Sequence, residues 1–135
     1  MPADPQTPAR LELGVIFATE EKYSAAETEF AAATKADPKN LQAWFNLGSV
    51  RVSQEKYKQA VDAFKQVTKL DPKRAHGWYA LAHSQSQIKD YKNALNSAIK
   101  ASALGNKNVD YMLLVASLQA QNKQLNDAQL TYDKI

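Results

Sequence analysis

Apolar and polar residues alternate along most of the chain at helical rather than strand spacing. In residues 41–54, Trp44, Leu47 and Arg51 lie three and four positions apart, which is the spacing of side chains on one face of a helix. The segment Glu55–Tyr57 interrupts this run, and a second apolar stripe follows it. That stripe consists of Ala60, Phe64 and Val67. The pattern predicts two helices joined by a short turn.

The two-helix pattern recurs with a period of 34 residues and without insertions. Equivalent positions are Ala26, Ala60, Ala94 and Ala128; Tyr23, Tyr57, Tyr91 and Leu125; and Leu13, Leu47, Leu81 and Val115. Such a unit buries its apolar face only against its neighbours, so consecutive copies are expected to stack. The predicted repeats are 7–40, 41–74, 75–108 and a truncated copy, 109–135, after a disordered tail of residues 1–6.

The predicted second helices end at residues that stop a helix. Pro38 follows the second helix of the first copy and Pro72 follows that of the second copy, because proline disfavours helical backbone at the residue before it. In the third copy, Gly105 stands near the same place. We expect Gly105 to adopt the left-handed backbone conformation that often closes a helix.

Small and large residues have separate expected roles in this unit. Gly48 and the series that contains Ala60 are expected where paired helices come closest, since larger side chains there would separate them. Tryptophan and phenylalanine are expected to fill the space between one repeat and the next, which a single helix pair cannot bury alone.

A 34-residue unit with W-x-x-L-G, an aromatic residue, A-x-x-x-F and a closing proline resembles the tetratricopeptide repeat. The second copy matches this motif best, with Trp44, Leu47, Gly48, Tyr57, Ala60, Phe64 and Pro72. The first copy has Arg10 at the tryptophan position, and the third has Ala82 and Ala98 at the glycine and phenylalanine positions. The resemblance implies an all-α fold, a right-handed superhelical solenoid of about four helix-turn-helix repeats.

The resemblance also implies that the first helix of each repeat lines the concave face, where partners bind. Phe45 and Tyr79 each follow a core tryptophan, so we expect them to point away from it and to form an apolar floor for a peptide. The alternative is that the two rings pack only against neighbouring first helices. Asn46 is expected either to hold the backbone of a ligand or to be an ordinary exposed residue. The candidate groove residues are Leu11, Val15, Gln42, Phe45, Asn46, Ser49, Val52, His76, Tyr79, His83, Leu113 and Ser117.

These residues favour a non-enzymatic protein–protein interaction module that binds a peptide or a helical segment of a partner protein in its concave groove. The alternative is a self-assembling scaffold, or a fragment of a longer solenoid, that oligomerises through an uncapped C-terminal end. Leu118, Leu125 and Leu130 would contribute to that end. Family members that clamp a partner's C-terminal carboxylate carry Lys and Asn where this chain has Leu11 and Val15, so such a clamp is not expected.

Composition and charge add only exclusions. The chain has no cysteine, which rules out disulfides and cysteine-based zinc sites. His76 and His83 are seven positions apart, about 10 Å along a helix, so we expect no metal site from them. Motifs of catalysis or nucleotide binding are absent, and we expect no enzyme activity, cofactor or small-molecule substrate. The net charge of +3 comes from lysines placed mainly on turns and second helices, which favours a solvated outer surface over a nucleic-acid site.

The sequence does not assign a cellular location. Its N-terminal residues lack the basic and apolar regions of a signal peptide. The longest apolar run, residues 112–116, is far too short to cross a membrane. The location is therefore left open, with the cytoplasm as the default expectation.

Overall fold

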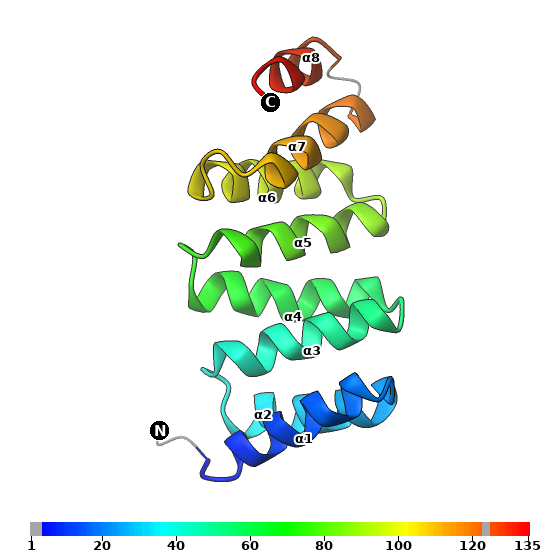
Figure 1. The fold of residues 1–135 in the computed structure, drawn as a ribbon, viewed down its shortest axis with the longest axis vertical. Coiled ribbons are helices and arrows are strands. Elements are labelled where there is room, and N and C mark those ends of the chain that lie inside the picture. Colours follow the sequence, from blue (N-terminus) through cyan, green and yellow to red (C-terminus); the bar gives the residue numbers. More distant parts are fainter. Residues whose placement is uncertain (1–3, 123–124) are drawn as a thin grey trace. The chain divides into compact units, whose positions relative to one another are not determined.

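The structure is a computed structural model that describes residues 4–122 and 125–135. Within those residues the chain forms eight α-helices and no β-strand (Figure 1). The helices are α1 Thr7–Thr19, α2 Tyr23–Ala36, α3 Leu41–Ser53, α4 Tyr57–Leu70, α5 Ala75–Gln87, α6 Tyr91–Leu104, α7 Val109–Gln121 and α8 Leu125–Asp133. The prediction of an all-α fold built from four helix pairs is confirmed.

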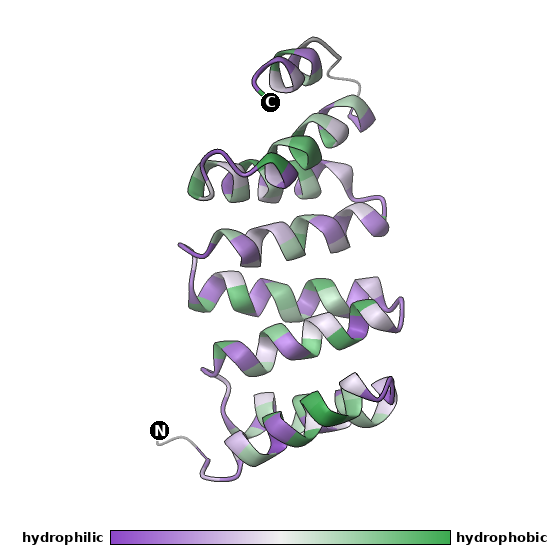
Figure 2. Ribbon diagram, in the orientation of Figure 1, coloured by the Kyte–Doolittle hydropathy of each residue, from purple (hydrophilic) through white to green (hydrophobic). Residues whose placement is uncertain are grey.

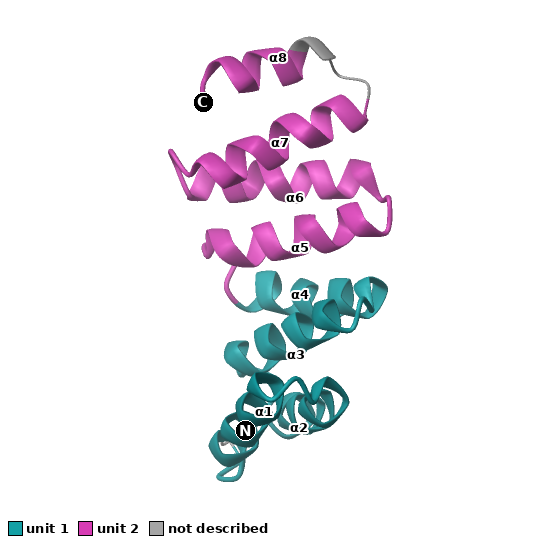
Figure 3. Ribbon diagram, turned by 45° about the vertical axis from the view of Figure 1, so that its right-hand side comes forward, with its two compact units in different colours: residues 1–70 teal, residues 71–135 magenta. Residues whose placement is uncertain are grey.

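The chain divides into two compact units of two helix pairs each (Figure 3). Unit 1, Met1–Leu70, contains α1 to α4, and unit 2, Asp71–Ile135, contains α5 to α8. In each unit the two helices of a pair pack against each other. The second helix of the first pair also packs against the first helix of the next pair. These contacts are those of helical hairpins stacked in sequence order.

The alanines that recur every 34 residues are buried in the packed helices. Ala26, Ala60 and Ala94 are fully buried, and Ala128 is nearly so. Apolar and polar residues are interspersed along the helices (Figure 2), and buried positions recur among exposed ones along the described helices. The alanine series therefore belongs to the core of both units.

The turns inside the first three repeats share one backbone conformation. Glu21, Glu55 and Lys89 occupy equivalent positions, and their φ angles are 61°, 59° and 64°. In each turn the next residue donates its N–H to a carbonyl five residues earlier, as Lys56 does to Arg51 at 2.8 Å. This arrangement closes the first helix with a left-handed residue, a place that usually favours glycine. The 34-residue period thus extends from side chains to backbone geometry.

The two tryptophans make equivalent hydrogen bonds in their repeats. Trp44 Nε1 donates a hydrogen bond to the carbonyl of Pro38, and Trp78 Nε1 donates one to the carbonyl of Pro72, both at 2.8 Å. In unit 2, the ammonium group of Lys100 lies 4.3 Å from the centre of the Trp78 ring. A tryptophan at this register therefore binds the turn before its own helix.

The prediction for Gly105 is wrong. Its φ is −98°, outside the left-handed region, and Lys107 adopts a positive φ of 71° instead. Glycine is needed at this position for a steric reason, because a Cβ atom there would overlap the ring of Tyr111. The sequence correctly marked a special position but assigned it the wrong cause.

A charged cluster joins the first two repeats in unit 1. The Glu27 carboxylate on α2 accepts hydrogen bonds from Arg51, Gln54 and Lys56 at 2.9 to 3.1 Å. Burial alone would raise the pKa of Glu27, but the hydrogen bonds from Lys56, Gln54 and Arg51 outweigh it and lower the pKa from 4.5 to about 2. The carboxylate is therefore held ionised where α2, α3 and the next turn meet.

Two predictions fall partly outside the described residues. These are the disordered tail, of which residues 1–3 are not described, and the contribution of the Leu125 side chain to an exposed C-terminal end. Leu130 is exposed as that prediction requires. Leu118 is fully buried in the core of unit 2, so its assignment to an exposed end is wrong.

Candidate binding face

The predicted groove residues all lie on the first helices of the repeats, α1, α3, α5 and α7. None of them is buried. Those that are exposed are Val15, Gln42, Ser49, His76, His83, Leu113 and Ser117, and those that are half-buried are Leu11, Phe45, Asn46, Val52 and Tyr79. We call this set the first-helix face and describe it separately in each unit.

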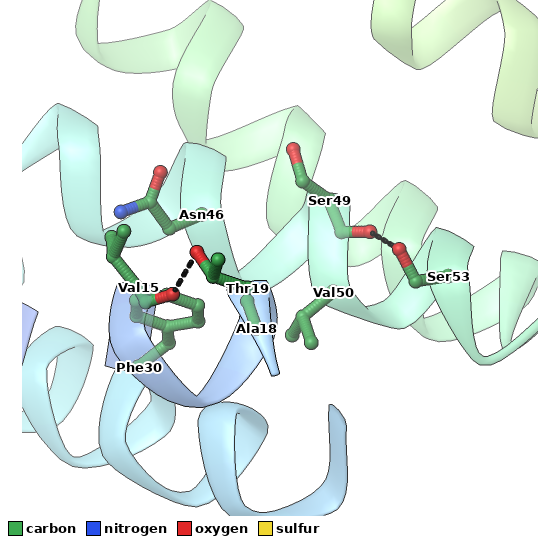
Figure 4. A pocket seen from close by; sticks show the side chains of 8 residues that line it. All are labelled: Val15, Ala18, Thr19, Phe30, Asn46, Ser49, Val50 and Ser53. Carbon is green, nitrogen blue, oxygen red and sulfur yellow. Dashed lines mark hydrogen bonds between the residues drawn. The ribbon is translucent and has the colours of Figure 1, made fainter. Parts of the chain in front are cut away.

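Three of the predicted residues in unit 1 line one pocket between α1 and α3 (Figure 4), which we call the α1–α3 pocket. Its volume is about 300 Å³, within the range of sites that hold small groups. Its lining residues are Val15, Ala18, Thr19, Phe30, Asn46, Ser49, Val50 and Ser53. Phe30 and Val50 are buried core residues, so the inner wall is apolar while the rim carries hydroxyl and amide groups.

The polar groups at this rim have a defined hydrogen-bonding direction. The hydroxyl of Thr19 donates to the carbonyl of Val15 at 2.9 Å, and that of Ser53 donates to the carbonyl of Ser49 at 3.2 Å (Figure 4). Each hydroxyl proton is therefore committed within its own helix, and each oxygen can only accept a further hydrogen bond.

The side-chain amide of Asn46 offers a hydrogen-bond donor at the same rim. Its Oδ1 atom accepts a hydrogen bond from Gln42 Nε2 at 2.6 Å. The remaining capacity for donation lies on its Nδ2 group. The rim thus offers acceptors from the hydroxyls and a donor from Asn46.

Phe45 has a mixed environment. Its ring lies edge-on to Phe64 of α4, with the ring centres 5.6 Å apart. Part of the Phe45 side chain is therefore used to pack α3 against α4, and the rest remains accessible. Its role as a ligand anchor stays a prediction.

The predicted residues of unit 2 gather in an aromatic cluster on α5 and α7. The Tyr79 ring lies 6.3 Å from that of His76, 6.5 Å from that of His83 and 4.9 Å from that of Tyr111. Tyr111 is a member that the sequence analysis missed. It stands at the position of Ala43 in the second repeat, and its only signal in the sequence was the nearby Gly105 that accommodates its ring.

The remaining unit 2 candidates, Leu113 and Ser117, are exposed on α7. Apart from the two histidines, the first-helix face has no acidic or basic side chain among its predicted members. In the described part of the chain, no group of three or more His, Asp or Glu side chains is placed to hold a metal ion. None of the described helices has the length and apolar character needed to cross a membrane.

Comparisons with known proteins agree with this architecture. A family model described as tetratricopeptide repeat matches residues 11–75 and 47–108. No curated protein sequence matches the chain.

Solved structures match nearly the whole chain at low sequence identity. A crystal structure of MamA protein is 21% identical, with a TM-score of 0.92 over 96% of this chain and 70% of that one. A MamA fragment from Desulfovibrio magneticus RS-1 is 20% identical, with a TM-score of 0.87 over 95% of this chain and 72% of that one. The first tetratricopeptide repeat region of Spaghetti (RPAP3), bound to the HSP90 peptide SRMEEVD, is 16% identical. Its TM-score is 0.81 over 87% of this chain and 94% of that one. These likenesses show the fold.

Proposed function

The chain belongs to the tetratricopeptide repeat family, and we propose that its first-helix face binds a segment of a partner polypeptide, either extended or helical. The family is in general a non-enzymatic interaction fold. The observation that carries the proposal is the α1–α3 pocket, which combines an apolar wall with a polar rim at Thr19, Asn46 and Ser53. In this proposal the chain acts through recognition, with no chemical step of its own.

The polarity of the rim favours a peptide backbone beside the pocket. Thr19 and Ser53 can accept from a ligand N–H, and Asn46 can donate to a ligand carbonyl. A peptide group supplies both partners within one residue, while the apolar wall accommodates the side chain of that residue. The aromatic cluster around Tyr79 supplies a second apolar contact area of the kind that anchors interfaces.

The charge of the face favours an uncharged partner segment. The solved relative RPAP3 is bound to an acidic HSP90 peptide. Here Leu11 and Val15 stand where carboxylate-clamping members carry Lys and Asn, and the face has no lysine or arginine among its predicted members. We therefore propose a neutral segment with aliphatic or aromatic side chains, whose binding depends weakly on salt concentration.

A matched pair of variants on α1 tests the proposal by affinity capture. Val15 and Ile16 are equally exposed, at 48% and 49%, but only Val15 lines the α1–α3 pocket. We expect Val15→Asp to reduce partner capture at least about tenfold, because a desolvated carboxylate beside an apolar wall is costly. Ile16→Asp should capture the partner as the wild type does.

The same experiment carries its own stability control. Circular dichroism melts of both variants should stay close to that of the wild type, since exposed substitutions change stability little. Equal capture by Val15→Asp and wild-type baits would remove the α1–α3 pocket from the binding face.

Self-association is the second candidate function, and one observation favours it. Tyr132 occupies the register position of Phe30 and Phe64, which are 2% exposed, yet Tyr132 is 46% exposed. A second copy of the chain could cover this exposed ring. An untagged copy added to the capture experiment measures this directly: retention of that copy supports self-association, and its complete loss on washing contradicts it.

A further inference from the structure

A second pocket lies in unit 2. It shares only α7 with the first-helix face. It is bordered by α6, the turn that follows it, α7 and α8, and its volume is about 370 Å³. Its lining residues are Ile99, Ser102, Ala103, Asn106, Lys107, Met112, Val115, Thr131 and Lys134. We call it the Met112 pocket. None of the predicted groove residues contributes to it.

Met112 occupies the tryptophan register of the fourth repeat. Trp44, Trp78 and Met112 are separated by 34 residues each. Val115 likewise stands where Leu47 and Leu81 stand in the second and third repeats. Both replacements remove side-chain volume at one place, which accounts for a pocket where the second and third repeats carry an indole.

The partners that hold the indole of Trp78 have counterparts in the Met112 pocket. Trp78 donates to the carbonyl of Pro72, and the residue equivalent to Pro72 is Asn106, which lines the pocket. Lys100 lies over the Trp78 ring, and the residue equivalent to Lys100 is Lys134, which also lines the pocket. The residues at both of these register positions thus line the pocket, while the ring is replaced by a thioether.

The aromatic residue next to Met112 does not take over the missing role. The Tyr111 ring packs against Gly105 and lies 4.9 Å from the Tyr79 ring. It is therefore engaged in the aromatic cluster on α5 and α7. The Tyr111 ring does not line the Met112 pocket.

We infer that the Met112 pocket binds the indole ring of a tryptophan side chain supplied by a partner polypeptide. The ring would take the place that Trp78 takes in its own repeat, with its N–H donating to the Asn106 carbonyl and its face beneath the Lys134 ammonium group. Ile99 and Val115 would contact its edges. This is a binding site additional to the first-helix face, and it does not depend on that face being functional.

Nuclear magnetic resonance of the Met112 methyl group tests the inference in the wild-type chain. The sequence has only two methionines, Met1 and Met112, so the methyl assignment is simple. We expect N-acetyl-tryptophanamide to shift the Met112 methyl resonance saturably and to leave that of Met1 unchanged. No shift at millimolar probe would overturn the inference.

A second probe distinguishes the two possible sources of an indole. Free tryptophan carries an ammonium and a carboxylate in place of the two amides. We expect it to bind more weakly than N-acetyl-tryptophanamide, because its ammonium and its carboxylate both lose hydration on binding. Tighter binding of free tryptophan would assign the pocket to the amino acid and overturn the polypeptide part of the inference.

Substitutions provide the complementary test. Met112→Trp places an indole of the chain itself in the pocket, so we expect it to abolish probe binding and to raise the melting temperature by about 2–6 °C. Val109→Trp adds the same ring at an exposed position of the same helix, outside both the Met112 pocket and the first-helix face, and should preserve both values. Lys134→Ala should weaken probe binding about threefold or more through loss of the cation–π contact. A lower melting temperature for Met112→Trp, or retained probe binding, would contradict an indole-shaped site.

Discussion

Replacing Gly48 with alanine is expected to lower the free energy of unfolding by about 1–3 kcal/mol, the usual range for overpacking a core. In an unobstructed helix the same change would stabilise by roughly 0.5–1 kcal/mol. Here the added Cβ would lie 2.6 Å from the ring of Phe64. That ring is buried and also contacts Phe45 edge-on, so it cannot move aside without disturbing α3 and α4.

Urea denaturation of Gly48→Ala and three comparison variants measures this effect. Ser49→Ala, at the next and exposed position of α3, serves as the control and should stay within about 0.5 kcal/mol of the wild type. Phe64→Ala alone is expected to cost about 3–5 kcal/mol. In the Gly48→Ala/Phe64→Ala double variant the new Cβ enters the space that the ring leaves. The loss of unfolding free energy should therefore be smaller than the sum of the two single losses by at least about 1 kcal/mol.

The third repeat explains why the double variant is informative. It carries Ala82 and Ala98 at the positions of Gly48 and Phe64, and both alanines are fully buried. The glycine–phenylalanine pair and the alanine–alanine pair are thus two packing solutions for one register. Strictly additive losses in the Gly48→Ala/Phe64→Ala variant would contradict this equivalence.

Glu27→Gln is expected to destabilise the chain by about 2–3 kcal/mol at neutral pH. Its pKa of about 2 in the folded chain is about 2.5 units below the ordinary value of 4.5, and each unit corresponds to about 1.4 kcal/mol. The carboxylate is 20% exposed, so the full conversion is reduced slightly for solvent screening. The glutamine keeps the shape but removes the charge that Arg51 and Lys56 pair with.

The pH dependence of this difference identifies its cause. Because the pKa of Glu27 is lower in the folded than in the unfolded chain, the unfolded chain binds the proton first as the pH falls. The stabilisation is therefore complete above about pH 4.5 and is lost between about pH 4.5 and pH 2. Denaturant melts of wild type and Glu27→Gln should converge at pH 2. Curves that stay parallel from pH 7 to pH 2 would show that the loss is not due to the charge.

The sequence pattern predicts the fold well because the repeat restates the same information several times. A helix expected in residues 41–54 is observed as Leu41–Ser53, and second helices begin at the equivalent Tyr23, Tyr57 and Tyr91. Periodic apolar positions determine which side of a helix is buried, and four copies average out local exceptions. The helix bounds and the buried face of each helix are therefore the features that the sequence pattern predicts.

Features that depend on one particular neighbour could not be predicted in this way. The position of Gly105 was recognised, but its cause is the ring of Tyr111, six residues later. Phe45 was expected on the binding face, and its contact with Phe64 depends on how α3 lies on α4. The Glu27 cluster joins residues 24 to 29 positions apart, and their spacing in sequence carries no periodic signal.

The candidate binding face lies between these two cases. The register predicts that Val15, Asn46 and Ser49 share a face, and the structure brings these three to one pocket. The hydrogen-bond directions at the rim depend on rotamers, such as that of Thr19 toward the Val15 carbonyl, and only the structure defines them. The register also places Met112 at a tryptophan position, but a pocket there follows only from the packing of α6, α7 and α8.

The proposal that first helices contact a partner polypeptide is tested most directly by photo-crosslinking from defined positions. A photoreactive phenylalanine analogue replaces Ser49 on α3 or His83 on α5. As controls it replaces Lys65 on α4 or Lys92 on α6, which are also exposed. We predict covalent adducts with the same partner polypeptide from Ser49 and His83, and none from Lys65 or Lys92. Adducts that form mainly from the second-helix positions, or equally from all four, would contradict the proposed binding face.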